Sequence, residues 1–188
     1  MNQKIKKLTV SAMFLALGLV LPFLTGQIPQ IGKMLLPMHI PVLLCGLICG
    51  PAYGAVVGFV VPLLRGILFS TPVLFPKGIA MAFELLTYGL VIGVLYTVFL
   101  KLFSDQSGKN IGALYGSLIG AMLAGRVVLG LVNTVLLGLF AEGYTWKMFV
   151  AGAFLDAIPG IIVQLVLIPA VMMVLLKTGL VPLDRKNK

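Results

Sequence analysis

Four ionisable side chains lie within apolar stretches that are long enough to cross a membrane, and these are Arg65, Glu84, Arg126 and Asp156. A charge at the centre of a bilayer costs roughly 2.5 kcal/mol or more, so such side chains normally face a protein interior or a cavity and have partners. Two bases and two acids can form ion pairs that tie helices together, or they can line a pocket for a polar molecule. The two interpretations are compatible, because pocket walls are often held by such pairs.

Further polar and aromatic residues in the same stretches can complete a binding pocket. The predicted substrate-binding residues are Arg65, Glu84, Arg126, Asn133, Asp156, His39, Tyr88 and Gln164. His39 also has a simpler interpretation, as a helix cap or a packing residue near the start of its apolar segment. For the others, a convergent polar set inside an apolar shell is typical of small-molecule sites.

The composition identifies an integral membrane protein. The chain has 188 residues, of which 60% are hydrophobic and only 10% charged, whereas soluble domains have about 45–50% apolar and about 25% charged residues. The basic residues are not interleaved with aromatic ones, so nucleic acid is not expected as a partner. Cys45 and Cys49 are expected to pack as small hydrophobic residues, and neither a metal site nor a cofactor is predicted.

The apolar segments predict an all-α membrane protein, a six-transmembrane-helix bundle that forms a single transmembrane domain over residues 1–188. Gly50-Pro51 permits only a tight turn, so the second and third segments should form a short helical hairpin. The predicted spans cover about residues 7–26, 37–49, 52–69, 78–100, 111–139 and 148–176.

The distribution of basic residues predicts that both termini are cytoplasmic. Nine basic residues fall on the side of the termini: Lys4, Lys6, Lys7, Lys101, Lys109, Lys177, Arg185, Lys186 and Lys188. Three fall on the other side, namely Lys33, Lys77 and Lys147. Cytoplasmic loops carry the excess of Lys and Arg in multi-pass membrane proteins. In this orientation the ionisable residues within the spans lie in the outer half of the membrane or near its middle.

Small residues four positions apart indicate close helix packing. Most such pairs in this chain, including Gly54 with Gly58 and Gly89 with Gly93, are expected to pack internally. Ala12 and Ala16 differ because they follow the basic N-terminal segment at the cytoplasmic end of the first span. They are therefore predicted to be a partner-binding surface for another membrane helix.

Four stretches together resemble the substrate-binding S component of energy-coupling factor (ECF) vitamin transporters, and the resemblance covers essentially the whole chain. They are Lys-Ile-Lys-Lys-Leu-Thr-Val-Ser-Ala-Met-Phe-Leu-Ala at 4–16, the segment at 37–58 that begins Pro-Met-His-Ile-Pro, Pro-Leu-Leu-Arg at 62–65 and Phe-Glu-Leu-Leu-Thr-Tyr-Gly at 83–89. The resemblance implies uptake of a water-soluble vitamin across the bacterial plasma membrane. It also implies a transmembrane coupling protein that contacts Ala12 and Ala16, and two ATPase subunits. The chain itself has no Gly-x-x-x-x-Gly-Lys-Ser/Thr phosphate loop, so it is not expected to hydrolyse ATP.

The identity of the vitamin is less constrained. An arginine can hold a carboxylate through two parallel hydrogen bonds, which favours pantothenate. Acidic residues would suit pyridoxine or a hydroxymethylpyrimidine, and riboflavin would need more stacking surface. A stand-alone secondary carrier or channel is a further alternative, although no internal repeat is evident. An intramembrane enzyme is disfavoured because no Gly-x-Ser-x-Gly motif and no second membrane Asp are present.

Overall fold

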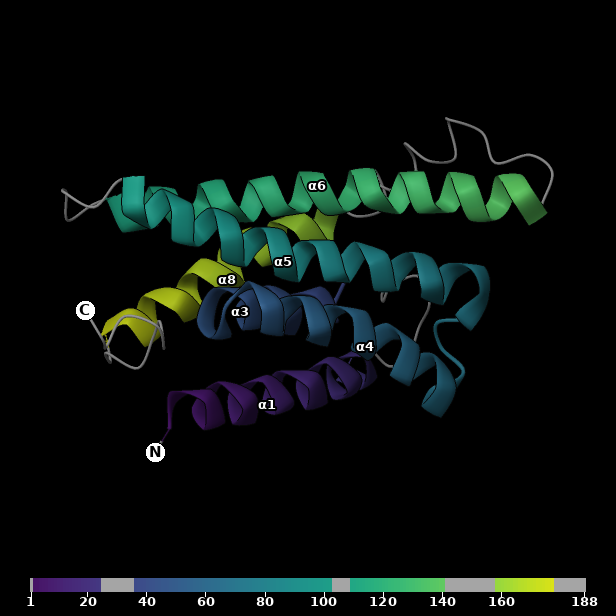
Figure 1. Ribbon diagram of the computed structural model, residues 1–188, viewed down its shortest axis with the longest axis horizontal. Coiled ribbons are helices and arrows are strands. Elements are labelled where there is room, and N and C mark those ends of the chain that lie inside the picture. The colour runs from purple at the N-terminus through teal and green to yellow at the C-terminus, as the bar shows by residue number, and fades with distance from the viewer. Residues whose placement is uncertain (1, 25–35, 103–108, 141–157, 178–188) are drawn as a thin grey trace.

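The computed structural model describes residues 2–24, 36–102, 109–140 and 158–177, and this part of the chain contains helices and no strands (Figure 1). A helix satisfies its backbone hydrogen bonds internally, which a segment within lipid requires. The predicted all-α class is therefore confirmed. The helices are α1 (Gln3–Leu24), α3 (His39–Cys49), α4 (Pro51–Phe69), α5 (Ile79–Leu102), α6 (Lys109–Phe140) and α8 (Ile158–Lys177).

Five of these helices are long and apolar enough to cross a membrane, and α3 is the short one. The helix bounds follow the first five predicted spans to within a few residues. For the sixth span, residues 148–157 lie outside the described residues, and α8 accounts for the remainder. Between α4 and α5, the Pro-rich connection contains a short turn, η1 (Leu74–Gly78), in which Phe75 has extended backbone angles.

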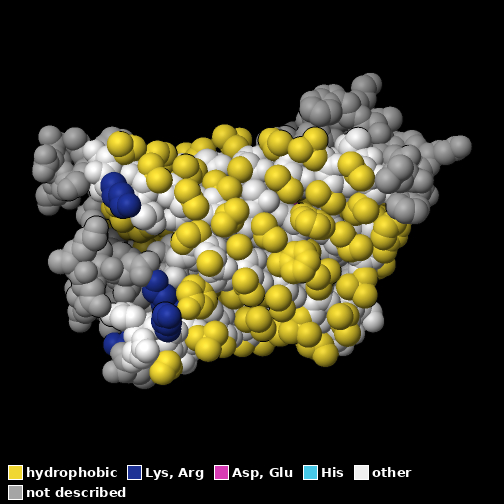
Figure 2. Space-filling view, viewed as in Figure 1, with side chains coloured by type: hydrophobic (Ala, Val, Ile, Leu, Met, Phe, Trp, Pro, Cys, Tyr) yellow, Lys and Arg dark blue, Asp and Glu magenta, His cyan; other side chains and the backbone are white. Residues whose placement is uncertain are grey.

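The helix ends agree with the predicted orientation. The start of α1, the end of α5, the start of α6 and the end of α8 lie together at one end of the bundle, on the left in Figure 1. Figure 2 shows the visible Lys and Arg side chains at this same end, whereas apolar side chains cover the body of the molecule. A basic end and an apolar girdle are the expected surface of a multi-pass membrane protein.

The short helix α3 forms the centre of the bundle. It contacts α1, α4, α5 and α8, and ten of its eleven residues are buried. Gly50 alone separates α3 from α4, with a φ of 103° that favours glycine. The predicted hairpin of the second and third segments is thus present, and it places His39, the first residue of α3, inside the bundle.

Glycines allow α3, α4 and α5 to approach closely, as the small-residue spacing predicted. A Cβ atom at Gly46 would lie 2.5 Å from the carbonyl oxygen of Gly89, and one at Gly54 would lie 2.7 Å from that same oxygen. A Cβ at Gly58 would overlap the carbonyl group of Leu85. Backbone contacts of this kind fix α5 against the α3–α4 pair, and α5 carries Glu84.

Candidate functional site

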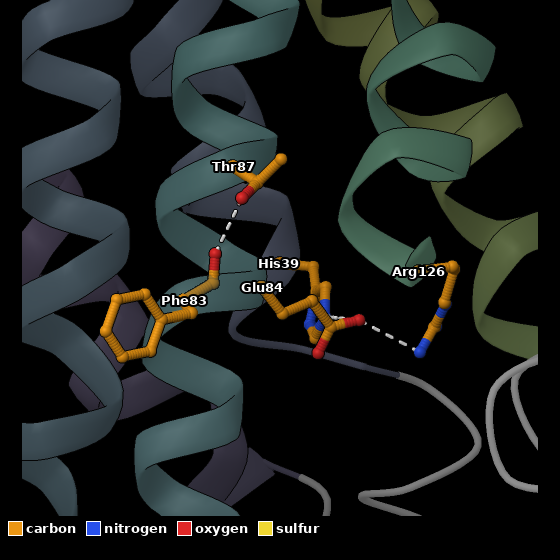
Figure 3. Close-up of polar contacts among 5 residues, drawn as sticks. All are labelled: His39, Phe83, Glu84, Thr87 and Arg126. Carbon is orange, nitrogen blue, oxygen red and sulfur yellow. Dashed lines mark hydrogen bonds and ion pairs between the residues drawn. The ribbon is translucent and has the colours of Figure 1, made fainter. Parts of the chain in front are cut away.

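Glu84, Arg126 and His39 form a polar cluster between three helices (Figure 3). Oε1 of Glu84, on α5, lies 3.0 Å from Nη1 of Arg126, on α6. The same oxygen lies 3.5 Å from Nε2 of His39, on α3. All three residues were predicted from the sequence to line one pocket, and the structure brings them together.

The cluster is removed from solvent. The exposed fractions are 1% for His39, 2% for Glu84 and 4% for Arg126. A buried ion pair gains Coulomb energy but loses the hydration of both charges, so its remaining polar atoms need hydrogen-bond partners. The hydroxyl of Thr87, one turn along α5 from Phe83, does not join the cluster, because it donates to the Phe83 carbonyl oxygen at 2.8 Å on the exposed side of α5 (Figure 3).

Several buried polar atoms of the cluster have no hydrogen-bond partner among the described residues. They include Nε and Nη2 of Arg126 and both ring nitrogens of His39. Nε–H and Nη2–H lie along one edge of the planar guanidinium, and such an edge can donate two parallel hydrogen bonds to a carboxylate. Glu84 pairs with Nη1 on the other side, so this edge of Arg126 makes no hydrogen bond to a described residue.

Tyr88 forms an aromatic wall of the cluster. It is 1% exposed, and its ring meets the His39 ring edge-on with centroids 5.1 Å apart. On its other flank the ring packs against Gly125, where a Cβ would lie 2.8 Å from Cε1 of Tyr88. The small residue beside Arg126 thus makes room for the aromatic ring, a role that the sequence analysis did not assign to Gly125. The feature of the sequence that could have pointed to Gly125 was its position next to a membrane arginine.

Two further predicted residues, Gln164 and Asn133, lie on α8 and on α6, the helix that also carries Arg126. Gln164 lies on α8, which contacts α3 and α6, and it is 1% exposed with an Nε2 that has no hydrogen-bond partner among the described residues. Asn133 is half-buried and lies two turns beyond Arg126 on α6. Asp156, the remaining predicted acid, lies outside the described residues.

Arg65 has different surroundings from the other predicted residues. Its Nη1 donates to the carbonyl oxygen of Leu19 on α1 at 2.7 Å. Its guanidinium lies over the ring of Phe23, 4.9 Å from the centroid, and over that of Phe69 at 5.5 Å. These contacts connect α4 to the last turns of α1, and the part of the chain that the structure describes contains no ion pair between Arg65 and Glu84.

The two cysteines are buried on α3, and Sγ of Cys45 lies 3.6 Å from the hydroxyl oxygen of Ser11 on α1. Within the described residues, no group of three or more His, Cys, Asp or Glu side chains is placed to hold a metal ion.

The fold and the cluster define a class, an all-helical multi-pass membrane protein with a charged site buried between its helices. Comparison with protein families gives a match to the ECF transporter, substrate-specific component, over residues 6–172. The chain therefore belongs to this family, and it is a substrate-binding transporter subunit and not an enzyme. No curated protein and no solved structure matches it.

Proposed function

We propose that this chain is the high-affinity subunit that binds a water-soluble vitamin for ATP-driven uptake across the bacterial plasma membrane, and that the vitamin is pantothenate. The family supports substrate binding and an ECF module as the partner. The Glu84–Arg126–His39 cluster is the binding core, joined by Tyr88 and Gln164. Asn133, Asp156 and Arg65 are the further candidates for contacts with the substrate.

The unpaired edge of Arg126 is the observation that carries the choice of substrate. Its Nε and Nη2 are buried and without hydrogen-bond partners among the described residues. Leaving buried donors unpaired is unfavourable by about 1–3 kcal/mol for each group, and more for charged ones. A ligand carboxylate would accept from both donors at once, and pantothenate carries one carboxylate together with hydroxyl and amide groups.

The alternative vitamins fit this cluster less well. Pyridoxine or a hydroxymethylpyrimidine would need a free acid for its ring nitrogen or hydroxyls, but Glu84 is already paired with Arg126. Riboflavin would need a broad stacking surface, and Tyr88 already packs between His39 and Gly125. A carboxylate-bearing substrate uses the donors that remain.

The exposed side of α1 supports an interaction with a transmembrane coupling protein. Ala12 and Ala16 are both exposed, and neighbouring large apolar residues such as Leu8 and Met13 are exposed by 64% and 60%. Only 17% of the α1 span is buried in the bundle, against 50% for the segment that contains α5. We therefore assign the Ala12–Ala16 surface to the coupling protein and ATP hydrolysis to two ATPase subunits.

Identification of bound small molecules tests the proposal. Protein purified in detergent is analysed by mass spectrometry for released molecules and is titrated calorimetrically with pantothenate, pyridoxine and riboflavin. We expect pantothenate to bind in the nanomolar to low-micromolar range, as is typical of a high-affinity uptake system. Tight binding of another vitamin to folded protein would replace the substrate assignment. Uptake into vesicles that lack ATPase subunits would instead support a stand-alone carrier.

A further inference from the structure

The described polar cluster is electrically balanced before any substrate binds. Glu84 contributes one negative charge and Arg126 one positive charge, and they form an ion pair at 3.0 Å. His39 contributes no charge when its ring is neutral. All three residues are at most 4% exposed, so neither water nor salt screens a change in their total charge effectively.

A carboxylate that binds the free edge of Arg126 would add one negative charge to this buried cluster. Arg126 would then be the only positive charge paired with two carboxylates, that of Glu84 and that of the substrate. Two negative charges that share one positive partner in a buried site repel each other, and a further positive charge offsets this repulsion. Resting on the proposed function above, we propose that an acidic substrate binds together with one proton, and that His39 accepts that proton.

The position of His39 fits this role. Its Nε2 already lies 3.5 Å from Oε1 of Glu84, within the range of an ion pair if the ring is protonated. Both of its ring nitrogens lack hydrogen-bond partners among the described residues, and a protonated ring donates from both. Protonated His39 would therefore balance Glu84, and Arg126 would be released to balance the substrate carboxylate.

Few other described groups near His39 can accept the proton. From α5, Glu84 and Tyr88 contact it, and from α6, Arg126 reaches it through Glu84. On α4, Arg65 contacts α1 instead of the cluster. Among the described residues, the remaining neighbours contribute no charge near it, because Gln164 of α8 is uncharged and the lysines of α1 lie at the basic end of the bundle. Asp156, the further acid proposed for the site, lies outside the described residues.

Calorimetry of the purified full chain measures the proton directly. Pantothenate is titrated at pH 7 in several buffers that differ in their enthalpy of ionisation, and the dependence of the observed heat on that enthalpy gives the number of protons taken up. We expect about one proton per pantothenate, and an affinity that falls by up to about tenfold per pH unit as the pH rises. The neutral alcohol analogue of pantothenate is the matched control, and its binding should take up no proton.

The His39→Gln variant tests whether His39 accepts the proton. Glutamine keeps a polar side chain at this position but does not titrate, so proton uptake should fall to nearly none and pantothenate should bind less tightly. Proton uptake that persists in folded His39→Gln protein would overturn the assignment to His39 and would point to one of the two acids of the proposed site, Glu84 or Asp156. Pantothenate binding without proton uptake by the unaltered protein would overturn the inference alone, whatever the variant does. Absence of any pantothenate binding would instead overturn the proposed function.

Discussion

Oε1 of Glu84 lies between two bases, 3.0 Å from Nη1 of Arg126 and 3.5 Å from Nε2 of His39. One carboxylate oxygen thus connects α5 to both α6 and α3. Of the two interpretations that the sequence left open for Glu84 and Arg126, the structure shows the ion pair that holds α5 to α6, and ligand binding by the same atoms stays a prediction.

Removing the charge of Glu84 should destabilise the protein. In Glu84→Gln the side chain keeps its size, but Arg126 is left as a buried charge without its partner, and loss of one partner of a buried pair costs about 3–5 kcal/mol. We expect a clearly lower midpoint of thermal unfolding in detergent. The double variant Glu84→Gln/Arg126→Gln should recover part of the loss, because it leaves no unpaired charge. An unchanged midpoint for the single variant would contradict a stabilising ion pair.

Replacing Arg126 by lysine tests whether substrate binding needs the planar guanidinium and not only its positive charge. Lysine keeps the positive charge near Glu84 but cannot offer two parallel donors along a planar edge. Since a hydrogen bond to a charged group contributes about 1.5–3 kcal/mol, we expect the Kd for pantothenate to rise about tenfold to a hundredfold. Binding of the neutral alcohol analogue should change much less. An equal loss for both ligands would mean that Arg126 does not bind the carboxylate.

Glycine packing can be tested with a matched pair of substitutions. A Cβ at Gly89 would overlap the backbone of Gly54 on α4, whereas one at Gly112 on α6 would meet nothing within 4 Å. Gly89→Ala should therefore lower the thermal midpoint by forcing α4 and α5 apart, at about 1–3 kcal/mol or more. Gly112→Ala should leave it unchanged or raise it, by up to about 1 kcal/mol of helix propensity. Equal effects at both positions would rule out this packing account.

Much of this arrangement could be predicted from the sequence, because membrane helices and membrane charges have simple energetic rules. The lengths of the apolar segments predicted the helices, and the Gly50-Pro51 turn predicted the hairpin of α3 and α4. The rarity of charges in lipid marked Glu84 and Arg126 as residues that need partners within the protein. Depth along each helix could also be estimated from the orientation given by the lysines, which placed Glu84 and Arg126 in the outer half of the membrane or near its middle.

The rotation of each helix about its axis could not be predicted from these rules. Arg65 was grouped with Glu84 because both are charges in the outer half, yet its guanidinium contacts Leu19 and Phe23 on α1. Which neighbour a side chain meets depends on how the helices pack, and nearly uniform apolar surfaces such as that of α5 give no periodic signal. For the same reason the contact of Gly125 with Tyr88 was not foreseen.

Arg65 should therefore contribute to the attachment of α1. Arg65→Gln removes the hydrogen bond to the Leu19 carbonyl oxygen and the contact of the cation with Phe23 and Phe69. We expect a lower thermal midpoint, reflecting about 1–3 kcal/mol, and Arg65→Lys should recover only part of it because lysine lacks the flat guanidinium. If Arg65→Gln instead weakens vitamin binding while the midpoint is unchanged, Arg65 belongs to the binding site as the sequence predicted.

The Ala12–Ala16 surface is expected to bind the coupling protein during assembly of the transporter. Both alanines are exposed on α1, a helix whose span is only 17% buried in the bundle. Leucine at both positions would keep the surface apolar and leave the fold intact, but it would hold a partner helix farther away, because close helix packing in membranes needs small residues. We therefore expect normal pantothenate binding by the purified double variant and loss of co-purification with the coupling protein and ATPases.

Ala170 provides the control for this experiment, since it is likewise exposed but lies on α8. Ala170→Leu makes the same kind of substitution once on the apolar surface and should leave both vitamin binding and assembly unchanged. If the double variant at Ala12 and Ala16 assembles as well as Ala170→Leu, the coupling protein does not bind this side of α1. If both substitutions block assembly, added bulk acts through a general effect on the bundle and the assignment to α1 loses its support.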